Sequence, residues 1–155
     1  MDSVREQLQI FVRRFGLLNA TCCEACCGED VSLVQSHILF EIRRMGEPSM
    51  QQVAEELGID VTTFSRQVKA MEGDGLVTRR PSERDRRVSL LGLTDEGRQV
   101  LVRIDRYMAE KIGQIFSVMT PFEREVTTRS LALFNEALAK VGEAASDGKN
   151  IACCN

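Results

Sequence analysis

Apolar residues recur along most of the chain with the spacing of amphipathic helices. The pattern starts near the N-terminus, returns after residues 32, 49 and 60, and continues over residues 94–141. Intervals of three or four residues place these side chains on one helix face, which is expected to be buried. A two-residue alternation over residues 76–92 indicates a short pair of strands. The pattern therefore predicts a mainly α fold with a small β element.

Capping residues mark where several of these helices begin. Ser49 with Gln52 has the spacing of a capping box, in which each side chain satisfies a free backbone N–H group. Ser32 and Thr94 precede two other apolar stripes, and Thr120 opens the sequence TPFE, with proline at the first helical position. The buried stripe of the helix after Ser32 is expected to be Val34, Ile38, Ile42 and Met45.

Two short helices are predicted on either side of the tight turn Gly58-Ile59-Asp60. The second helix is expected to bury Val61, Phe64, Val68 and Met71. Its opposite face carries hydroxyls and cations, namely Thr62, Thr63, Ser65, Arg66 and Lys69. Two helices joined by a glycine-containing turn form a helix-turn-helix. Such hydroxyls and cations reach base edges and phosphates when a helix end enters the major groove.

Residues 76–92 predict a β-hairpin with an arginine-rich tip, which makes the motif a winged helix-turn-helix. Leu76 and Val77 begin the first strand, and the polar tip runs from Arg80 to Arg87. The returning strand is expected to alternate through Val88, Leu90 and Gly92. Arginine at such a tip suits the narrow, electronegative minor groove of DNA.

The segment DRRVSLLGLTDEG, residues 85–97, resembles the wing signature of the MarR family of bacterial transcription regulators. That signature is Asp-x-Arg followed by Leu-Thr-x-x-Gly. The preceding VTTFSRQVKAMEGDGLVTRR, residues 61–80, resembles the family's recognition helix and wing entry. The resemblance covers residues 32–101. It implies an intertwined helical homodimer that binds pseudo-palindromic double-stranded operator DNA, commonly as a repressor released by a ligand or by cysteine oxidation.

The resemblance also implies roles for individual residues and regions. Positions matching the major-groove helix are Thr62, Thr63, Ser65, Arg66 and Lys69, and positions matching the wing tip are Arg84, Arg86 and Arg87. Asp85 matches an acid that steadies a wing arginine in the family. Residues 1–31 and 94–145 are expected to form dimerisation helices, residues 32–93 the DNA-binding domain, and residues 146–155 a cysteine-containing tail.

The six cysteines fall into two clusters, one near each end of the chain. They are Cys22, Cys23, Cys26 and Cys27, followed much later by Cys153 and Cys154. Thiols three or four residues apart share one face of a helix and can chelate, whereas adjacent cysteines diverge and do not easily close a relaxed disulfide. Soft thiolates select ions such as As(III), Cd(II), Zn(II) or Cu(I).

All six cysteines lie outside the predicted DNA-binding domain, in regions expected to set the geometry of the dimer. A thiophilic metal or metalloid ion bound there is expected to alter the spacing of the two recognition helices. Two alternatives remain open. Accessible thiols of low pKa could sense peroxide. The chain could also be a metal-binding or thiol-exchange protein that keeps the fold without regulatory DNA binding.

Charge and composition narrow the class of protein further. The formal net charge is −3, yet residues 60–92 carry seven Lys or Arg against five Asp or Glu, and a locally basic segment can contact phosphates. No apolar run reaches the length of a membrane span, and no secretory signal is recognisable, so a cytoplasmic protein with reduced thiols is expected. The single histidine, His37, is expected near the buried stripe of its helix. No nucleophile–base pair or phosphate loop indicates an enzyme.

Overall fold

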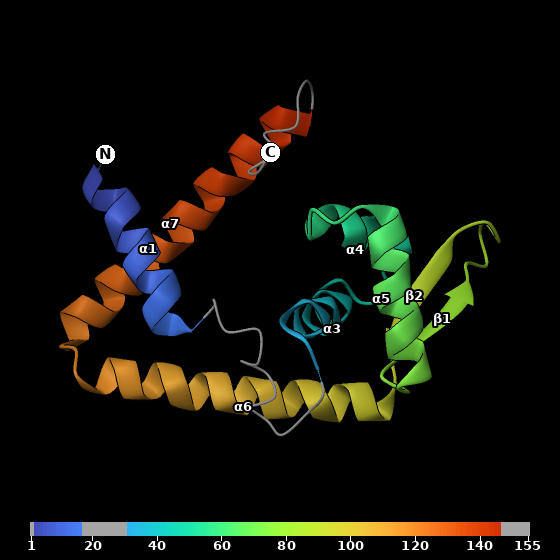
Figure 1. The fold of residues 1–155 in the computed structure, drawn as a ribbon, viewed down its shortest axis with the longest axis horizontal. Coiled ribbons are helices and arrows are strands. Elements are labelled where there is room, and N and C mark those ends of the chain that lie inside the picture. The colour runs from blue at the N-terminus through green and yellow to red at the C-terminus, as the bar shows by residue number, and fades with distance from the viewer. Residues whose placement is uncertain (1, 17–30, 147–155) are drawn as a thin grey trace. The chain divides into compact units, whose positions relative to one another are not determined.

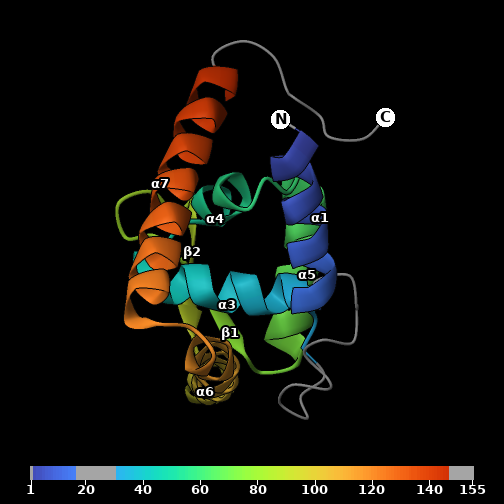
Figure 2. The same ribbon diagram turned by 90° about the vertical axis from the view of Figure 1, so that its left-hand side faces the viewer.

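The computed structural model describes residues 2–16 and 31–146 (Figures 1 and 2). Its elements are α1 (Asp2–Phe15), α3 (Leu33–Met45), α4 (Met50–Glu56), α5 (Val61–Gly73), β1 (Val77–Pro81), β2 (Ser89–Leu93), α6 (Asp95–Ser117) and α7 (Pro121–Ser146). The mainly helical class with a small antiparallel hairpin is confirmed. Contacts group residues 1–109 into one compact unit and residues 110–155 into a second. The division into dimerisation helices, DNA-binding domain and tail stays a prediction.

The core of the first unit is built from α3, α4, α5, β2 and the start of α6. In Figures 1 and 2, α3 and α6 are each seen side-on in one view and end-on in the other, so their axes cross. The largest fully buried side chains are Phe64, Ile38, Leu39, Met71, Leu91, Leu101, Val53, Val68 and Val100. Full burial of such a side chain is worth about 1.5–3 kcal/mol, so this cluster stabilises the arrangement of the five elements.

The capping signals predicted by the sequence are present. Ser32 with Gln35 and Ser49 with Gln52 both form reciprocal capping boxes. The Thr120 hydroxyl accepts a hydrogen bond from the Glu123 N–H at 3.3 Å, while the Glu123 carboxylate accepts one from the Thr120 N–H at 2.7 Å. These bonds satisfy backbone donors that have no partner inside the helix, so each helix start is fixed locally.

Two of the predicted buried positions are wrong. Val61 is 57% exposed because α5 starts at this residue, one turn before Phe64 reaches the core. Val34 is also exposed, and Leu39 occupies the core beside Ile38 instead. His37 is exposed rather than near the buried face. On α3 the buried stripe is therefore rotated from the expected one.

The hairpin pairs Val77 with Leu93 and Pro81 with Ser89. Its inward side chain is Leu91, whereas Val88 is 37% exposed and precedes the strand, so the predicted alternation is one residue out of phase. The sequence LLGL has apolar residues in both phases, so alternation alone does not determine which face is buried.

A loop joins the hairpin from the side opposite β1. The Leu91 N–H donates to the Pro48 carbonyl at 2.8 Å, and Ser49 forms an isolated bridge with Leu90. The edge of β2 is therefore paired with the segment that leads into α4. This contact ties the wing to the helix-turn-helix.

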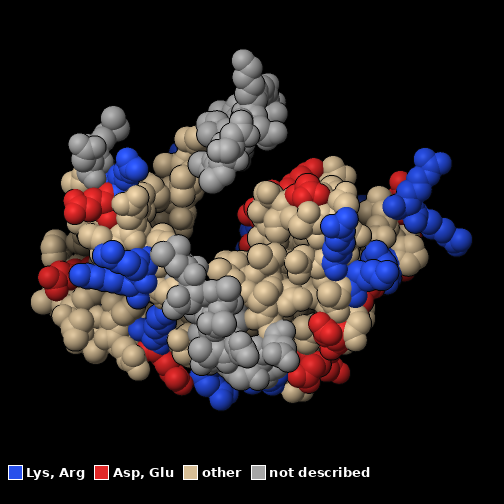
Figure 3. Space-filling model, viewed as in Figure 1, with Lys and Arg blue, Asp and Glu red and all other residues tan. Residues whose placement is uncertain are grey.

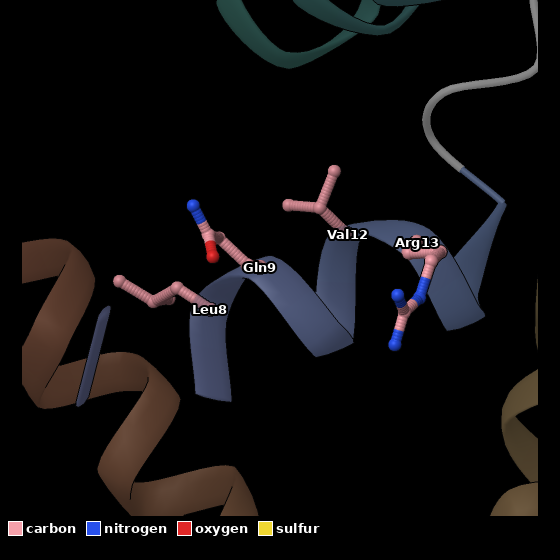
Figure 4. Close-up of a pocket in the computed structure, with 4 residues that line it drawn as sticks. All are labelled: Leu8, Gln9, Val12 and Arg13. Carbon is pink, nitrogen blue, oxygen red and sulfur yellow. The ribbon is translucent and has the colours of Figure 1, made fainter. Parts of the chain in front are cut away.

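Apolar side chains remain exposed on α1 and α7. On α7, Leu131, Leu133, Phe134, Leu138 and Val141 are 43–58% exposed, and on α1, Val4, Leu8 and Phe11 are also exposed. Leu8, Gln9, Val12 and Arg13 line an open pocket along α1 (Figure 4). Helices with such faces are typical of oligomer interfaces. The homodimer itself stays a prediction.

In the described part of the chain, no helix is both long and apolar enough to cross a membrane.

We predict that Gly97→Ala destabilises the fold by about 3 kcal/mol, since overpacking against rigid atoms has this order of cost. A Cβ at this position would lie 3.0 Å from the Leu76 carbonyl carbon and would overlap its oxygen. Urea unfolding followed by circular dichroism, at one protomer concentration, measures the change.

Gly113→Ala is the matched control, because it lies on the same helix and an added Cβ meets nothing within 4 Å. Replacing glycine by alanine inside a helix is expected to raise stability by about 0.5–1 kcal/mol. Equal stability changes for the two variants would contradict the close approach of Gly97 to Leu76.

Candidate nucleic-acid interface

Helix α5 separates a buried face from a polar one. Phe64, Val68 and Met71 are fully buried. The opposite face exposes Thr62, Thr63, Arg66 and Lys69, and Ser65 is partly buried. The buried face anchors the helix in the core, so the polar face is presented to solvent in a fixed orientation.

The start of α5 is held by Asp60. Its Oδ1 accepts a hydrogen bond from the Thr63 N–H at 2.9 Å, which makes Asp60 the N-cap. Hydrogen bonds from the Thr63 side chain and backbone lower the pKa of the Asp60 carboxyl below its ordinary value. The charged carboxylate is therefore favoured at a helix end where the backbone dipole is positive. This cap fixes the first turn, which carries Thr62 and Thr63.

Two arginines at the base of the wing are paired with acids. Arg79 Nη2 lies 3.3 Å from Glu72 Oε2 at the end of α5, and Arg80 Nη2 lies 2.6 Å from Glu47 Oε2 in the loop before α4. The hydrogen bond from Arg80 lowers the pKa of Glu47. These pairs join β1 to both neighbours. The predicted tip is shorter than expected, because Arg80 and Pro81 belong to β1.

The remaining cations of this region have a different environment. Within residues 31–146, no ion pair is formed by the side chains of Arg66, Lys69, Arg84, Arg86 or Arg87. In Figure 3, several Lys and Arg side chains lie where Figure 1 draws α5 and the hairpin. These charges are available for an anionic partner, whereas those of Arg79 and Arg80 are already neutralised.

Short local hydrogen bonds shape the wing tip. Asp85 Oδ1 accepts from the Arg87 N–H at 2.9 Å, and the Asp85 carbonyl accepts from the Val88 N–H at 2.9 Å. The Ser82 N–H donates to the Val88 carbonyl at 2.8 Å, which closes the turn. Asp85 thus contacts the backbone of a wing arginine and leaves its guanidinium unoccupied. The DNA-binding roles of these residues stay predictions.

Sequence reasoning identified the exposed cations but missed what holds them in place. Glu47 and Arg80 are 33 residues apart, and no local motif signals their contact. Thr94 Oγ1 donates a hydrogen bond to the Gly75 carbonyl at 2.6 Å and accepts one from the Gly97 N–H at 2.9 Å. Thr94 and Gly97 are both part of the wing signature, so the sequence did carry a signal for this contact. The predicted metal or redox site cannot be placed in the structure, because all six cysteines lie outside the described residues. Among the described residues, no group of three or more His, Cys, Asp or Glu side chains could hold a metal ion.

Comparisons with known proteins agree with this architecture. The MarR family model matches residues 29–88. The regulator PecS of Dickeya dadantii is 33% identical over 99 residues, which is 62% of this chain and 58% of PecS, so the chain spans less than two thirds of that relative.

Two solved structures of DNA complexes have the same fold. The FabT protein of Streptococcus pneumoniae, in complex with DNA, superposes with a TM-score of 0.78 at 23% identity, covering 90% of this chain and 98% of that one. The repressor CouR, bound to a 23-mer duplex, superposes with a TM-score of 0.66 at 26% identity, covering 86% and 89%. PecS is a transcriptional regulator and CouR is a transcriptional repressor. With its capped recognition helix, its arginine wing and these similarities, the chain belongs to the MarR family of DNA-binding transcriptional regulators.

Proposed function

We propose that this protein is a repressor that binds a pseudo-palindromic operator as a homodimer. In each half-site, α5 enters the major groove and the wing contacts the adjacent minor groove. The observation that carries this proposal is the sorting of the cations. Among the described residues, Arg79 and Arg80 are ion-paired at the base of the wing, whereas the cations on the face of α5 and at the wing tip make no such pair. Unpaired surface cations gain affinity for DNA by releasing counterions from its phosphates.

The exposed apolar faces of α1 and α7 support the homodimer. Several leucine, valine and phenylalanine side chains on these helices have no cover within the described chain. Burying them against a second copy recovers about 25 cal/mol for each Å² of apolar surface. A two-fold dimer places one α5 in each of two half-sites about 34 Å apart, the distance of one helical turn of DNA.

The proposed signal is a thiophilic metal or metalloid ion, such as As(III), Cd(II), Zn(II) or Cu(I). The support is in the sequence, where four of six consecutive residues from Cys22 to Cys27 are cysteines. Thiolates are the preferred ligands of these ions. Cys153 and Cys154 supply two further thiols from the other end of the chain. Cross-linking of these segments would change the spacing of the two DNA-binding lobes and release the operator.

We predict that Arg66→Ala and Arg86→Ala each weaken operator binding and reduce its dependence on salt. In a dimer, each variant removes two cations, so the slope of log K against log salt concentration falls in magnitude by about 2. Fluorescence anisotropy with a labelled operator over a series of salt concentrations measures both quantities.

Arg106→Ala is the matched control, because Arg106 is an exposed arginine of α6 that forms no ion pair within residues 31–146 and lies outside the proposed interface. Its slope is expected to equal that of the wild type. If all three variants kept the wild-type slope, the DNA-binding face would be misassigned. A wild-type protein that shows no salt-dependent DNA binding would favour the alternative of a metal-binding or thiol-exchange protein.

We also predict that Asp85→Ala weakens operator binding relative to Asp85→Asn by about fivefold for each half-site, or about 30-fold for the dimer, since one hydrogen bond contributes about 1 kcal/mol. Both variants remove the negative charge, but asparagine retains an acceptor for the Arg87 N–H. The comparison therefore isolates the shape of the wing tip from its charge. Equal affinities of the two variants would show that the Asp85 hydrogen bond does not order the tip.

The effector is tested with the fourfold variant in which Cys22, Cys23, Cys26 and Cys27 are replaced by serine. Under reductant, arsenite or Cd(II) is expected to release the wild-type protein from its operator, and the variant is expected to stay bound. Native mass spectrometry of the reduced dimer gives the stoichiometry of the bound ion and the thiol protons it displaces. A second variant, in which only Cys153 and Cys154 are replaced by serine, tests whether the tail contributes to ion-dependent release.

The outcomes separate the candidate signals. Metal-dependent release that persists in the fourfold variant would rule out the cysteine cluster as the ion site. Release by peroxide without any response to ions under reductant would support the redox alternative.

A further inference from the structure

Val61 is an exposed apolar residue at the N-terminal end of α5. It is the first residue of α5 and is 57% exposed, whereas Phe64, one turn later, is fully buried. The core of the domain therefore does not use this side chain. Its immediate neighbours, Thr62 and Thr63, are exposed members of the predicted DNA-binding face.

The geometry of a helix start directs Val61 towards a ligand that approaches end-on. Cα–Cβ bonds in a helix tilt towards the N-terminus, so the first side chain projects past the helix end. The Asp60 cap, with its hydrogen bond from the Thr63 N–H, fixes the backbone of this turn. Valine is branched at Cβ and has a restricted χ1 angle, so little further ordering is needed on binding.

The major groove offers a valine one kind of apolar group, the C5-methyl group of thymine. Recognition helices of the helix-turn-helix type contact base edges with their N-terminal residues. We infer that Val61 contacts a thymine methyl group in each half-site and makes this position of the operator A·T-specific. The inference rests on the proposed operator binding, and it assigns recognition of an A·T position, which contacts between cations and phosphates do not supply.

Removal of single methyl groups from DNA tests the inference with the wild-type protein. A preferred operator is first obtained by selection from a random duplex library. Each thymine of one half-site is then replaced, one at a time, by deoxyuridine, which lacks only the methyl group. At one thymine we expect binding to weaken about fourfold, the factor associated with burial of one methyl group.

The variant Val61→Ala completes the cycle. Its affinity for the selected operator is expected to fall, and the deoxyuridine substitution that weakens the wild type is expected to have no further effect. Val102→Ala is the matched control, because Val102 is 52% exposed on α6, away from the α5 helix start. It should retain the wild-type sensitivity to deoxyuridine. Thermal unfolding of Val61→Ala checks that the fold is kept, as expected for an exposed side chain.

Failure of this inference is distinguishable from failure of the proposed function. Sequence-specific binding by the wild type without sensitivity to any deoxyuridine would overturn the role of Val61 and leave the regulator intact. The same conclusion follows if Val61→Ala keeps the full sensitivity of the wild type. A wild-type protein that prefers no selected sequence over random DNA would overturn both.

Discussion

The carbonyl group of Leu76 is the point on which the DNA-binding region depends. It accepts a hydrogen bond from the Thr94 N–H at 3.1 Å. The Thr94 hydroxyl, which donates to the Gly75 carbonyl at 2.6 Å, shares its proton with the Leu76 oxygen at 3.1 Å, and Gly97 lies directly against the Leu76 carbonyl. Three elements meet there: the end of α5, the first strand of the wing and the start of α6. The Leu-Thr-x-x-Gly part of the wing signature thus has a physical basis. Threonine supplies the hydrogen bonds, and glycine permits an approach that any Cβ would prevent.

Further contacts extend this junction into a single body. Glu72–Arg79 joins α5 to β1, Glu47–Arg80 joins the loop before α4 to β1, and Arg43 of α3 pairs with Asp105 of α6. Each of these exposed pairs contributes little alone. Together with the buried core, however, they attach α5 and the wing to the same set of neighbouring elements. In the proposed homodimer, a signal would change DNA affinity by altering the distance between two such bodies. This is consistent with an input site outside the DNA-binding domain.

The accuracy of the sequence-based expectations depended on how local the determining interaction is. Ser49–Gln52 and Thr120–Glu123 act within one helical turn, so their spacing alone identified the helix starts. The phase of β2 was wrong because LLGL is apolar in both phases, and only the pairing with Pro48 and the core selects Leu91. Val61 was assigned to the core by periodicity, which describes the direction of a side chain but not where the core ends.

In the candidate interface too, the sequence predicted local features but not the contacts between residues that are distant in the chain. Composition revealed a locally basic segment on an acidic chain, but it did not separate the cations bound to acids from those that are unpaired. That separation depends on Glu47 and Glu72, which approach the wing only in the folded chain. The distinction between paired and unpaired cations also indicates which residues contribute to affinity and which to specificity. Contacts between cations and phosphates position the protein on any sequence, so discrimination among sequences depends on side chains that reach base edges. In that setting an exposed valine beside two threonines is a reader of base edges rather than a defect of the core.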